Sequence, residues 1–310
     1  MSNILDEIFN KIGEKKTANE ICDELNITPK QLNYYLNILK NHGVCYKTLF
    51  KDDGNILFDY YNSGYNCKLK KFDEGIDIIT NPNNECFKAM AIADLHIGSE
   101  HSRADLLDSV YEYCVQNNIH IIFCCGDILE GGYYQDEDFK KNCFKQIETF
   151  VKIYPYDKNI VTIAVLGNHD FTILKKIHFD PSVIINQRRL DIFVDSYNNS
   201  LINLGNDSIT LRHMYNKNDI INSKINIYGH RHLLSTNYEN NTYYITVPGL
   251  CEIGNEFPGA LELNLNIEEG YIKTCTINPL MEINKKLMPY TNGIVQSFLP
   301  HSKSRKKKSL

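Results

Sequence analysis

Short apolar runs separated by stretches of helical periodicity constrain the fold of this 310-residue chain more than any other feature. Two helical stretches, 102–117 and 137–153, lie between the first three runs. The runs span residues 87–93, 119–125, 160–166, 209–211, 225–228, 243–247 and 260–267. Short buried strands that alternate with helices predict an α/β layered domain. Because sites in such sheets lie at the carboxyl ends of strands, we expect functional side chains directly after the runs.

Residues that can bind metal ions do follow five of these runs. They are Asp94-Leu95-His96-Ile97-Gly98, Gly126-Asp127-Ile128-Leu129-Glu130, Gly167-Asn168-His169-Asp170, Arg212-His213 and Gly229-His230-Arg231-His232. Carboxylate, imidazole and amide groups suit Mn²⁺, Fe, Ni²⁺ or Zn²⁺ without any thiolate. Two such ions about 3.5–4 Å apart, bridged by one carboxylate, can clamp an in-line displacement at phosphorus. If the segments stay extended, Asp94 and His96 share one side, as do His230 and His232.

The motifs D-x-H-x-G, G-D-x-x-(D/E), G-N-H-D, an isolated His after a strand and G-H-x-H occur in this order. Together they resemble the calcineurin-like metallophosphoesterase family over residues 86–280. The resemblance implies an αββα sandwich with two divalent ions, Mn²⁺ first among the metals above. It implies the following ligands: Asp94, His96 and His232 for one ion, Asn168, His213 and His230 for the other, and Asp127 bridging. His169 resembles the family's histidine that binds no metal but protonates the leaving oxygen or stabilises the transition state.

Some residues depart from the family's usual motifs, and none of the departures removes a ligand. Glu130 replaces an Asp, Met214 replaces a Gly, and Leu250 stands where Ser often follows Gly. We expect Glu130 to support a ligand rather than bind metal. Asp170 should be a structural partner or should orient the His169 ring.

Arginines beside the motifs are candidates for contact with phosphate. Arg212, Arg231 and Asn168 all lie near the predicted ligands. Strand alternation would turn Arg231 away from them, so Arg212 is the stronger candidate. For both arginines a surface salt bridge is an equal alternative.

Residues 1–61 resemble a winged helix-turn-helix. Helical spacing over 2–13, a capping box at Thr17 and Glu20, and Thr28-Pro29 predict three helices. The turn Asp52-Asp53-Gly54-Asn55 predicts a hairpin. Residues that could face a major groove are Lys30, Gln31, Asn33, Tyr34 and Asn37. However, residues 1–66 hold seven lysines against nine acidic residues. Since phosphate neutralisation supplies most non-specific DNA affinity, protein docking, dimerisation or positioning are alternatives.

The other segments and the overall composition set limits on partners. Residues 62–85 read as a connector with a short strand at 76–80, and 281–310 as an extension with a basic tail. The net charge of −5 includes five positive residues at 301–310, so the remaining body is not a basic nucleic-acid surface. Ten scattered cysteines without a C-x-x-C pair favour a reducing, cytoplasmic setting. No run approaches the roughly 18 apolar residues of a membrane span.

These observations predict an enzyme that hydrolyses phosphoesters with two divalent ions. The first choice of substrate is a phosphodiester in DNA or RNA, because a winged helix and a basic tail accompany the catalytic motifs. Alternatives are a phosphomonoesterase, or a phosphoesterase acting on nucleotides or phosphoproteins. A different class remains open: a DNA- or partner-binding regulator without catalysis.

Overall fold

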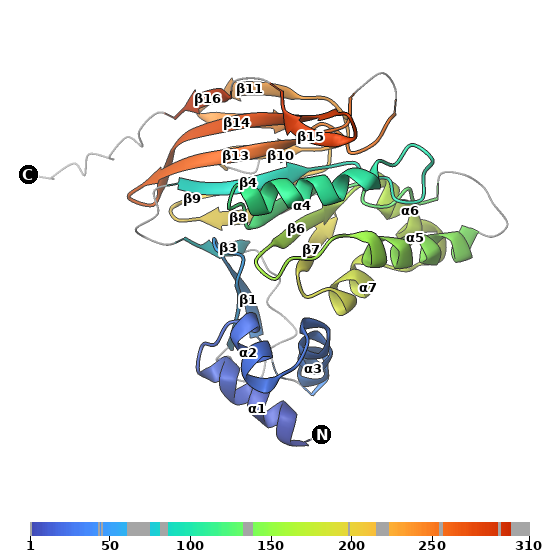
Figure 1. The fold of residues 1–310 in the computed structure, drawn as a ribbon, viewed down its shortest axis with the longest axis vertical. Coiled ribbons are helices and arrows are strands. Elements are labelled where there is room, and N and C mark those ends of the chain that lie inside the picture. The colour runs from blue at the N-terminus through green and yellow to red at the C-terminus, as the bar shows by residue number, and fades with distance from the viewer. Residues whose placement is uncertain are drawn as a thin grey trace, which may run out of the picture.

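The computed structural model describes residues 2–42, 44, 46–60, 75–80, 86–132, 139–197, 199–214, 223–253, 257–290 and 293–298 (Figure 1). The helices are α1 (Ser2–Gly13), α2 (Ala18–Leu25), α3 (Pro29–Asn41), η1 (Ala104–Leu106), α4 (Leu107–Gln116), α5 (Phe139–Ile153), α6 (Asn168–Ile177) and α7 (Pro181–Arg188). Within these residues no helix is long and apolar enough to cross a membrane. The basic tail at 301–310 and most of the predicted connector lie outside the described residues.

The strands form two sheets. The first sheet has the order β11-β12-β10-β9-β8-β3-β1-β2, and the second β15-β14-β13-β4-β5-β6-β7, with β16 paired to β14. The strands are β1 (Tyr46–Lys51), β2 (Ile56–Tyr60), β3 (Ile76–Ile79), β4 (Cys86–Ile92), β5 (Ile121–Cys125), β6 (Val161–Leu166), β7 (Ile192–Tyr197), β8 (Asn199–Leu204), β9 (Asp207–Arg212), β10 (Ile225–Tyr228), β11 (Ser235–Glu239), β12 (Thr242–Thr246), β13 (Gly259–Glu268), β14 (Tyr271–Ile283), β15 (Lys286–Pro289) and β16 (Ile294–Ser297).

The central strands of the second sheet are buried on both faces. Along β4, Ala89 and Ala91 join the core shared with the first sheet, while Met90 and Ile92 join a second core with helices α4 to α7. All of β5 is buried, which explains why its sequence reads as a continuous apolar run. Strands β4 to β7 are parallel, so their carboxyl ends meet at one edge. This edge carries the motifs that follow the first three runs.

The predicted α/β class is confirmed, and two stacked sheets with helices on one side agree with three layers of the predicted αββα sandwich. Helices α4 to α7 lie on the side of the second sheet. Over the described residues, no helix covers the outer face of the first sheet at β10, β12 and β11, where side chains instead line an open cavity. Residues 215–222, which connect the parallel strands β9 and β10, lie outside the described part, so the fourth layer stays a prediction.

The N-terminal segment is joined to the rest through a continuous sheet. β1 pairs antiparallel with β2 and parallel with β3, and β3 pairs parallel with β8. β3 lies within the segment predicted as a connector. In Figure 1 helices α1 to α3 lie together below the two sheets, and β1 and β3 lead upward from them. Apolar residues of these helices, such as Ile21 and Leu32, belong to the same buried core as the two sheets.

Helix α3 packs on α7. The Asn33 side-chain amide donates hydrogen bonds to the carbonyl oxygens of Asn186 at 3.0 Å and Gln187 at 2.8 Å. Asn33 is only 6% exposed, so the expectation that it faces outward is wrong: its face of the helix is taken up by α7. Lys30, by contrast, is exposed, as are Gln31 and Tyr34.

The α3–α7 contact predicts a stability effect. Asn33→Ala should lower the free energy of unfolding by about 1–3 kcal/mol, because two backbone carbonyls lose their buried donor. Urea unfolding followed by circular dichroism measures this change. Lys30→Ala, an exposed change on the same helix, is the control and should stay within about 0.5 kcal/mol of the unmodified protein. Equal stability of the two variants would contradict the contact.

Candidate metal centre

All seven predicted ligands lie together at the carboxyl edge of the strands. The ligand atoms of Asp127, His213 and His230 lie within 4.8 Å of one another. Two further groups meet the same limit: His96, Asp127 and His169, and His96, His232 and Cys251. The remaining two join through close contacts: Asn168 Oδ1 lies 2.9 Å from His213 Nε2, and Asp94 Oδ1 lies 3.5 Å from His232 Nε2.

The backbone has left-handed φ values at five of the seven predicted ligands. The φ values are 54° at Asp94, 46° at His96, 49° at Asp127, 69° at His230 and 55° at His232. Such values are uncommon for residues with a side chain and cluster at functional sites. The segments are therefore not extended. The argument that strand alternation places Asp94 beside His96, and His230 beside His232, does not apply. The paired side chains reach the centre through tight turns instead.

Neighbouring backbone groups hold the Asp127 carboxylate. Its Oδ1 accepts a hydrogen bond from the His169 backbone N–H at 2.8 Å. A Cβ atom at Gly167 would lie 2.1 Å from the same oxygen, so only glycine permits this approach. Burial raises the pKa of the Asp127 carboxyl, but the neighbouring histidines, His213 above all, outweigh burial and lower it. Asp127 therefore carries its negative charge at the centre of the site.

Asp170 connects the loops rather than orienting His169. Its carboxylate accepts hydrogen bonds from the backbone N–H groups of Ile128 at 3.1 Å, Leu129 at 2.8 Å and Gly167 at 2.8 Å. The His169 ring donates from Nδ1 to the carbonyl oxygen of Glu130 at 2.9 Å. Of the two roles expected for Asp170, the structure supports the structural one.

His213 presents one ring nitrogen to two acceptors. Its Nδ1–H donates to the Cys125 carbonyl at 2.9 Å, and its Nε2 lies 2.9 Å from Asn168 Oδ1 and 3.0 Å from Asp127 Oδ2. A ring nitrogen between two oxygen acceptors needs either a proton or a cation. Burial lowers the pKa of His213, but Asp127 and then Asp94 outweigh burial and raise it to about 9. The surroundings of His213 Nε2 therefore favour a positive charge at this position.

His96 has a buried nitrogen without a protein partner. Its Nδ1 lies 2.9 Å from Glu130 Oε2, which makes Nδ1 the protonated nitrogen. Its Nε2 is buried, makes no hydrogen bond and lies 4.0 Å from Asp127 Oδ2. An unsatisfied buried acceptor is costly unless a ligand satisfies it. Together with the carboxylate and histidine donors, it fits a bound divalent cation.

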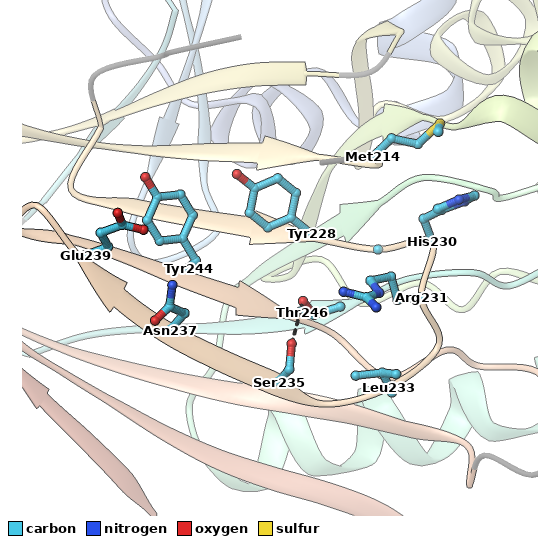
Figure 2. Close-up of a pocket in the computed structure, with 11 residues that line it drawn as sticks. Met214, Tyr228, His230, Arg231, Leu233, Ser235, Asn237, Glu239, Tyr244 and Thr246 are labelled. Carbon is cyan, nitrogen blue, oxygen red and sulfur yellow. Dashed lines mark hydrogen bonds between the residues drawn. The ribbon is translucent and has the colours of Figure 1, made fainter. Parts of the chain in front are cut away.

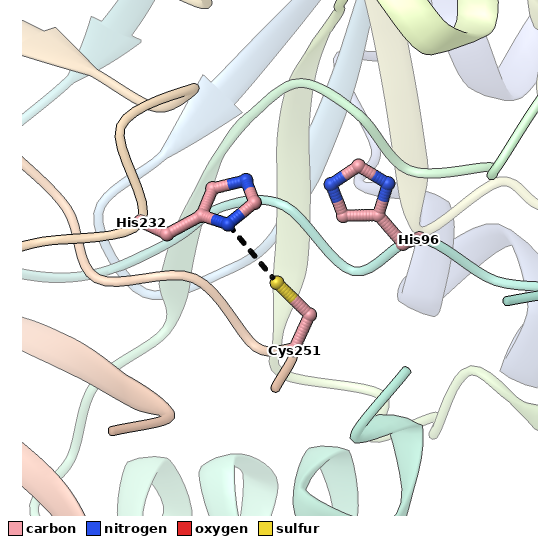
Figure 3. Close-up of side chains that lie close together, drawn as sticks. All are labelled: His96, His232 and Cys251. Atoms are coloured by element: carbon pink, nitrogen blue, oxygen red, sulfur yellow. Dashed lines mark hydrogen bonds between the residues drawn. The ribbon is translucent and has the colours of Figure 1, made fainter. Parts of the chain in front are cut away.

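Cys251 is a residue of the site that sequence reasoning missed. Figure 3 shows its thiol beside His232, with Sγ 3.5 Å from Nδ1, and His96 facing both. Burial lowers the pKa of His232, but Asp94 and Cys251 raise it to about 10. The only sequence signal was the turn after the run at 243–247. A bridge between Ala93 and Gly249 brings that turn beside Asp94.

The two arginines beside the motifs differ in their exposure. Arg212, on β9, is 2% exposed, which does not favour direct contact with a phosphate. Arg231 is exposed and lines a cavity of about 790 Å³, which His230 also lines (Figure 2). The left-handed turn at His230 and His232 removes the alternation that would have turned Arg231 away.

Comparison with known proteins places the chain in a family. Residues 87–256 match the sequence model of the calcineurin-like phosphoesterases. The chain belongs to this family. This confirms the family predicted from the motifs, whose members depend on metal ions. Among the described residues, the groups of side chains that could hold a metal lie within the matched range. A search of curated proteins finds no match.

Several solved structures have a similar fold. A predicted phosphoesterase from Streptococcus pneumoniae TIGR4 has 11% identity and a TM-score of 0.38, and covers 68% of this chain and 98% of its own. Vps29 with bound zinc from Entamoeba histolytica has 13% identity and a TM-score of 0.38, covering 68% and 99%. An archaeal phosphodiesterase has 14% identity and a TM-score of 0.42, covering 63% and 99%.

The Glu130–His96 contact predicts an effect on metal affinity. Glu130→Ala should weaken binding of Mn²⁺ about 10–100-fold, because the His96 ring loses the carboxylate that fixes its tautomer and orientation. Isothermal titration calorimetry on the metal-depleted protein measures this. Glu148→Ala, which removes a surface carboxylate paired with Arg188, is the control. An affinity equal to that of the control would argue against this role.

The His213–Asp127 pair predicts a pH dependence of the metal-free protein. The pKa of His213 rises from 6.5 to about 9 on folding, so its charged form adds stability below pH 6.5 that is lost as the pH rises through 9. The loss should be on the order of 2–3 kcal/mol. Urea unfolding in the presence of a chelator measures it. His213→Gln should flatten this part of the profile; an unchanged slope would assign it to other groups.

Proposed function

We propose that the protein hydrolyses phosphoesters with two divalent ions, and that its substrate is a phosphodiester of DNA or RNA. The observation that carries this proposal is the convergence of the seven predicted ligands in one place, together with the buried Nε2 of His96 that no protein group satisfies. A buried nitrogen that stays unsatisfied among charged groups lowers the stability of a protein unless a ligand binds it, so its presence favours a site that binds metal.

The residues divide between two ions as the family resemblance implies. Asp94, His96 and His232 would hold one, Asn168, His213 and His230 the other, and Asp127 would bridge them. Such ions supply an activated water and neutralise charge on the phosphate. The nitrogen and oxygen donors suit Mn²⁺, with Fe, Ni²⁺ and Zn²⁺ as alternatives, and the Cys251 thiol at the edge suits the softer of these.

His169 is placed to move a proton. Because Nδ1 donates to the Glu130 carbonyl, Nε2 is the nitrogen that faces the site, 3.9 Å from Asp127 Oδ2. The side chain is 21% exposed, so a substrate can reach it. The protonated ring would donate from Nε2 to the leaving oxygen, and the exposed Arg231 would contact the phosphate.

The N-terminal segment is proposed to be a winged-helix unit that positions partners beside the catalytic domain. Its α3 is held by α7 through Asn33, which leaves Lys30, Gln31 and Tyr34 for contact with DNA, RNA or a protein. A cytoplasmic setting is part of the same proposal. It is supported by the described cysteines, none of which forms a disulfide.

Hydrolysis of model esters tests this function. With Mn²⁺ the protein should hydrolyse bis-p-nitrophenyl phosphate faster than p-nitrophenyl phosphate. The reverse preference would identify a phosphomonoesterase. Turnover of neither ester with Mn²⁺, Fe²⁺, Ni²⁺ or Zn²⁺ would favour a regulator without catalysis.

Two variants separate proton transfer from metal binding. His169→Ala should lower kcat about 10²–10⁴-fold while metal content, measured by atomic emission, stays the same. Asp127→Ala should lose both activity and bound metal, because it removes the shared carboxylate. Full activity of His169→Ala would remove His169 from the reaction, and two tightly bound ions in Asp127→Ala would refute the bridging role.

A further inference from the structure

Cys251 differs from the other buried cysteines in its surroundings. Among the described residues, seven cysteines are buried. Six of them pack in one of the two apolar cores, and Cys251 belongs to neither core. It is 2% exposed, and its thiol lies beside His232 with His96 facing both (Figure 3). A buried free cysteine ordinarily acts as a small apolar side chain, and these polar surroundings point to a different role.

The turn that carries Cys251 is held on both sides by backbone hydrogen bonds. The N–H of Leu250, the residue before it, donates to the Ala93 carbonyl oxygen at 2.9 Å. The N–H of Glu252, the residue after it, donates to the His101 carbonyl oxygen at 2.8 Å. Both acceptors lie on the segment that follows β4 and carries the first metal-binding motif. The place of the thiol is therefore set by the fold of the site itself.

The thiol contacts one ring nitrogen of His232, and the Asp94 carboxylate lies near the other. Sγ lies 3.5 Å from Nδ1, while Nε2 lies 3.5 Å from Asp94 Oδ1. A Cβ atom at Gly249 would lie 3.0 Å from the sulfur and 3.3 Å from His232 Cγ, so the glycine leaves room for this contact. If Nε2 binds the ion that Asp94 also binds, Nδ1 carries the ring proton and the sulfur is its acceptor.

Three other histidines of the site are held in the same way. For His96 and His169 the partner of Nδ1 is Glu130, through its carboxylate at 2.9 Å and its carbonyl oxygen at 2.9 Å, respectively. For His213 the partner of Nδ1 is the Cys125 carbonyl oxygen, also at 2.9 Å. In all three rings Nε2 is the nitrogen on the side of the shared carboxylate. The fourth ring follows this pattern with a sulfur in place of an oxygen.

We propose that Cys251 is a positioning residue of the metal centre. Its sulfur accepts the Nδ1–H of His232 and so directs Nε2 toward the ion that Asp94 also holds. Partners of this kind fix the tautomer and the orientation of a metal-binding histidine, and metal affinity falls when they are removed. This inference rests on the proposed function, because it requires an ion at this position, and it adds a determinant of the affinity for that one ion.

Direct binding of the ion by the thiol is the competing role. Sγ and ring nitrogens of His96 and His232 lie within 4.8 Å of one another, which is close enough for a shared ion. The contact with Nδ1 favours positioning instead, because an ion on Nε2 and an acceptor on Nδ1 lie in different directions from the ring. The two roles predict different spectra for the protein loaded with Co²⁺.

Substitutions that separate the acceptor from the bulk of the side chain test the proposal. Cys251→Ser keeps an acceptor, Cys251→Val keeps the bulk without an acceptor, and Cys251→Ala has neither. Isothermal titration calorimetry measures binding of Mn²⁺ to the metal-depleted proteins. The alanine and valine variants should bind one of two ions about 10–100-fold more weakly, and the serine variant should bind it more tightly than either. Cys114→Ala, which removes a buried thiol from the core beside α4, is the matched control and should bind both ions normally.

Spectra with Co²⁺ show whether the sulfur binds the ion. A thiolate bound to Co²⁺ gives a strong charge-transfer absorption in the near ultraviolet, which nitrogen and oxygen ligands do not give. The Co²⁺-loaded protein should lack this absorption. An absorption that is present in the unmodified protein and in Cys114→Ala but lost in Cys251→Ala would overturn the proposal, because the sulfur would then be a ligand.

The outcomes separate this inference from the function on which it rests. Equal binding of two ions by every Cys251 variant would overturn the positioning role and leave the two-ion phosphoesterase intact. Full affinity in the valine variant with a loss in the serine variant would do the same, because bulk alone would then matter. If the valine variant does not fold, the serine and alanine variants decide alone, and equal affinities overturn the role. If the unmodified protein binds no ion, the proposed function fails and this inference fails with it.

Discussion

The burial of one charged carboxylate, that of Asp127, is the constraint on which the site depends. The side chain is 1% exposed, yet its pKa is held below the usual value by the histidines around it. A buried charge is tolerated only with partners, and here they come from separate strand ends: His213 after β9, His96 after β4 and the His169 backbone in α6. Their convergence requires the two sheets to align these ends, so the fold and the charge of the site support each other.

Strained loops accompany this arrangement, and a second carboxylate holds them. Five of the predicted ligands adopt left-handed φ values, which cost free energy and persist only where surrounding contacts enforce them. Asp170 supplies such contacts by accepting three backbone N–H groups from the turns after β5 and β6. Burial, followed by the charge of Asp127, raises the pKa of Asp170. The protein's own hydrogen bonds thus hold the turns in the arrangement that a bound cation would need.

The sequence predicted which side chains would meet, but it did not predict the backbone geometry that brings them together. Apolar runs located the strands of the second sheet well, because strands buried on both faces carry little else. The side chains predicted to meet do lie together, yet the turns that bring them together are left-handed, which periodicity cannot show. Cys251 and the arrangement of Arg231 depend on long-range pairing, such as the bridge from Ala93 to Gly249, and local patterns hold no information on it. Asn33 was misplaced for the same reason, since its partners on α7 lie more than 150 positions away.

The space over β10, β12 and β11 adjoins the candidate metal centre. In the described residues that space is a cavity next to His230, and the outward alternation of β10, β12 and β11 places aromatic, amide and carboxylate groups along it. The loop with His230 and His232 connects β10 to β11, and both of these strands pair with β12. Any ligand in this cavity would therefore lie beside His230, because the cavity begins where β10 ends and the loop with the predicted ligands starts.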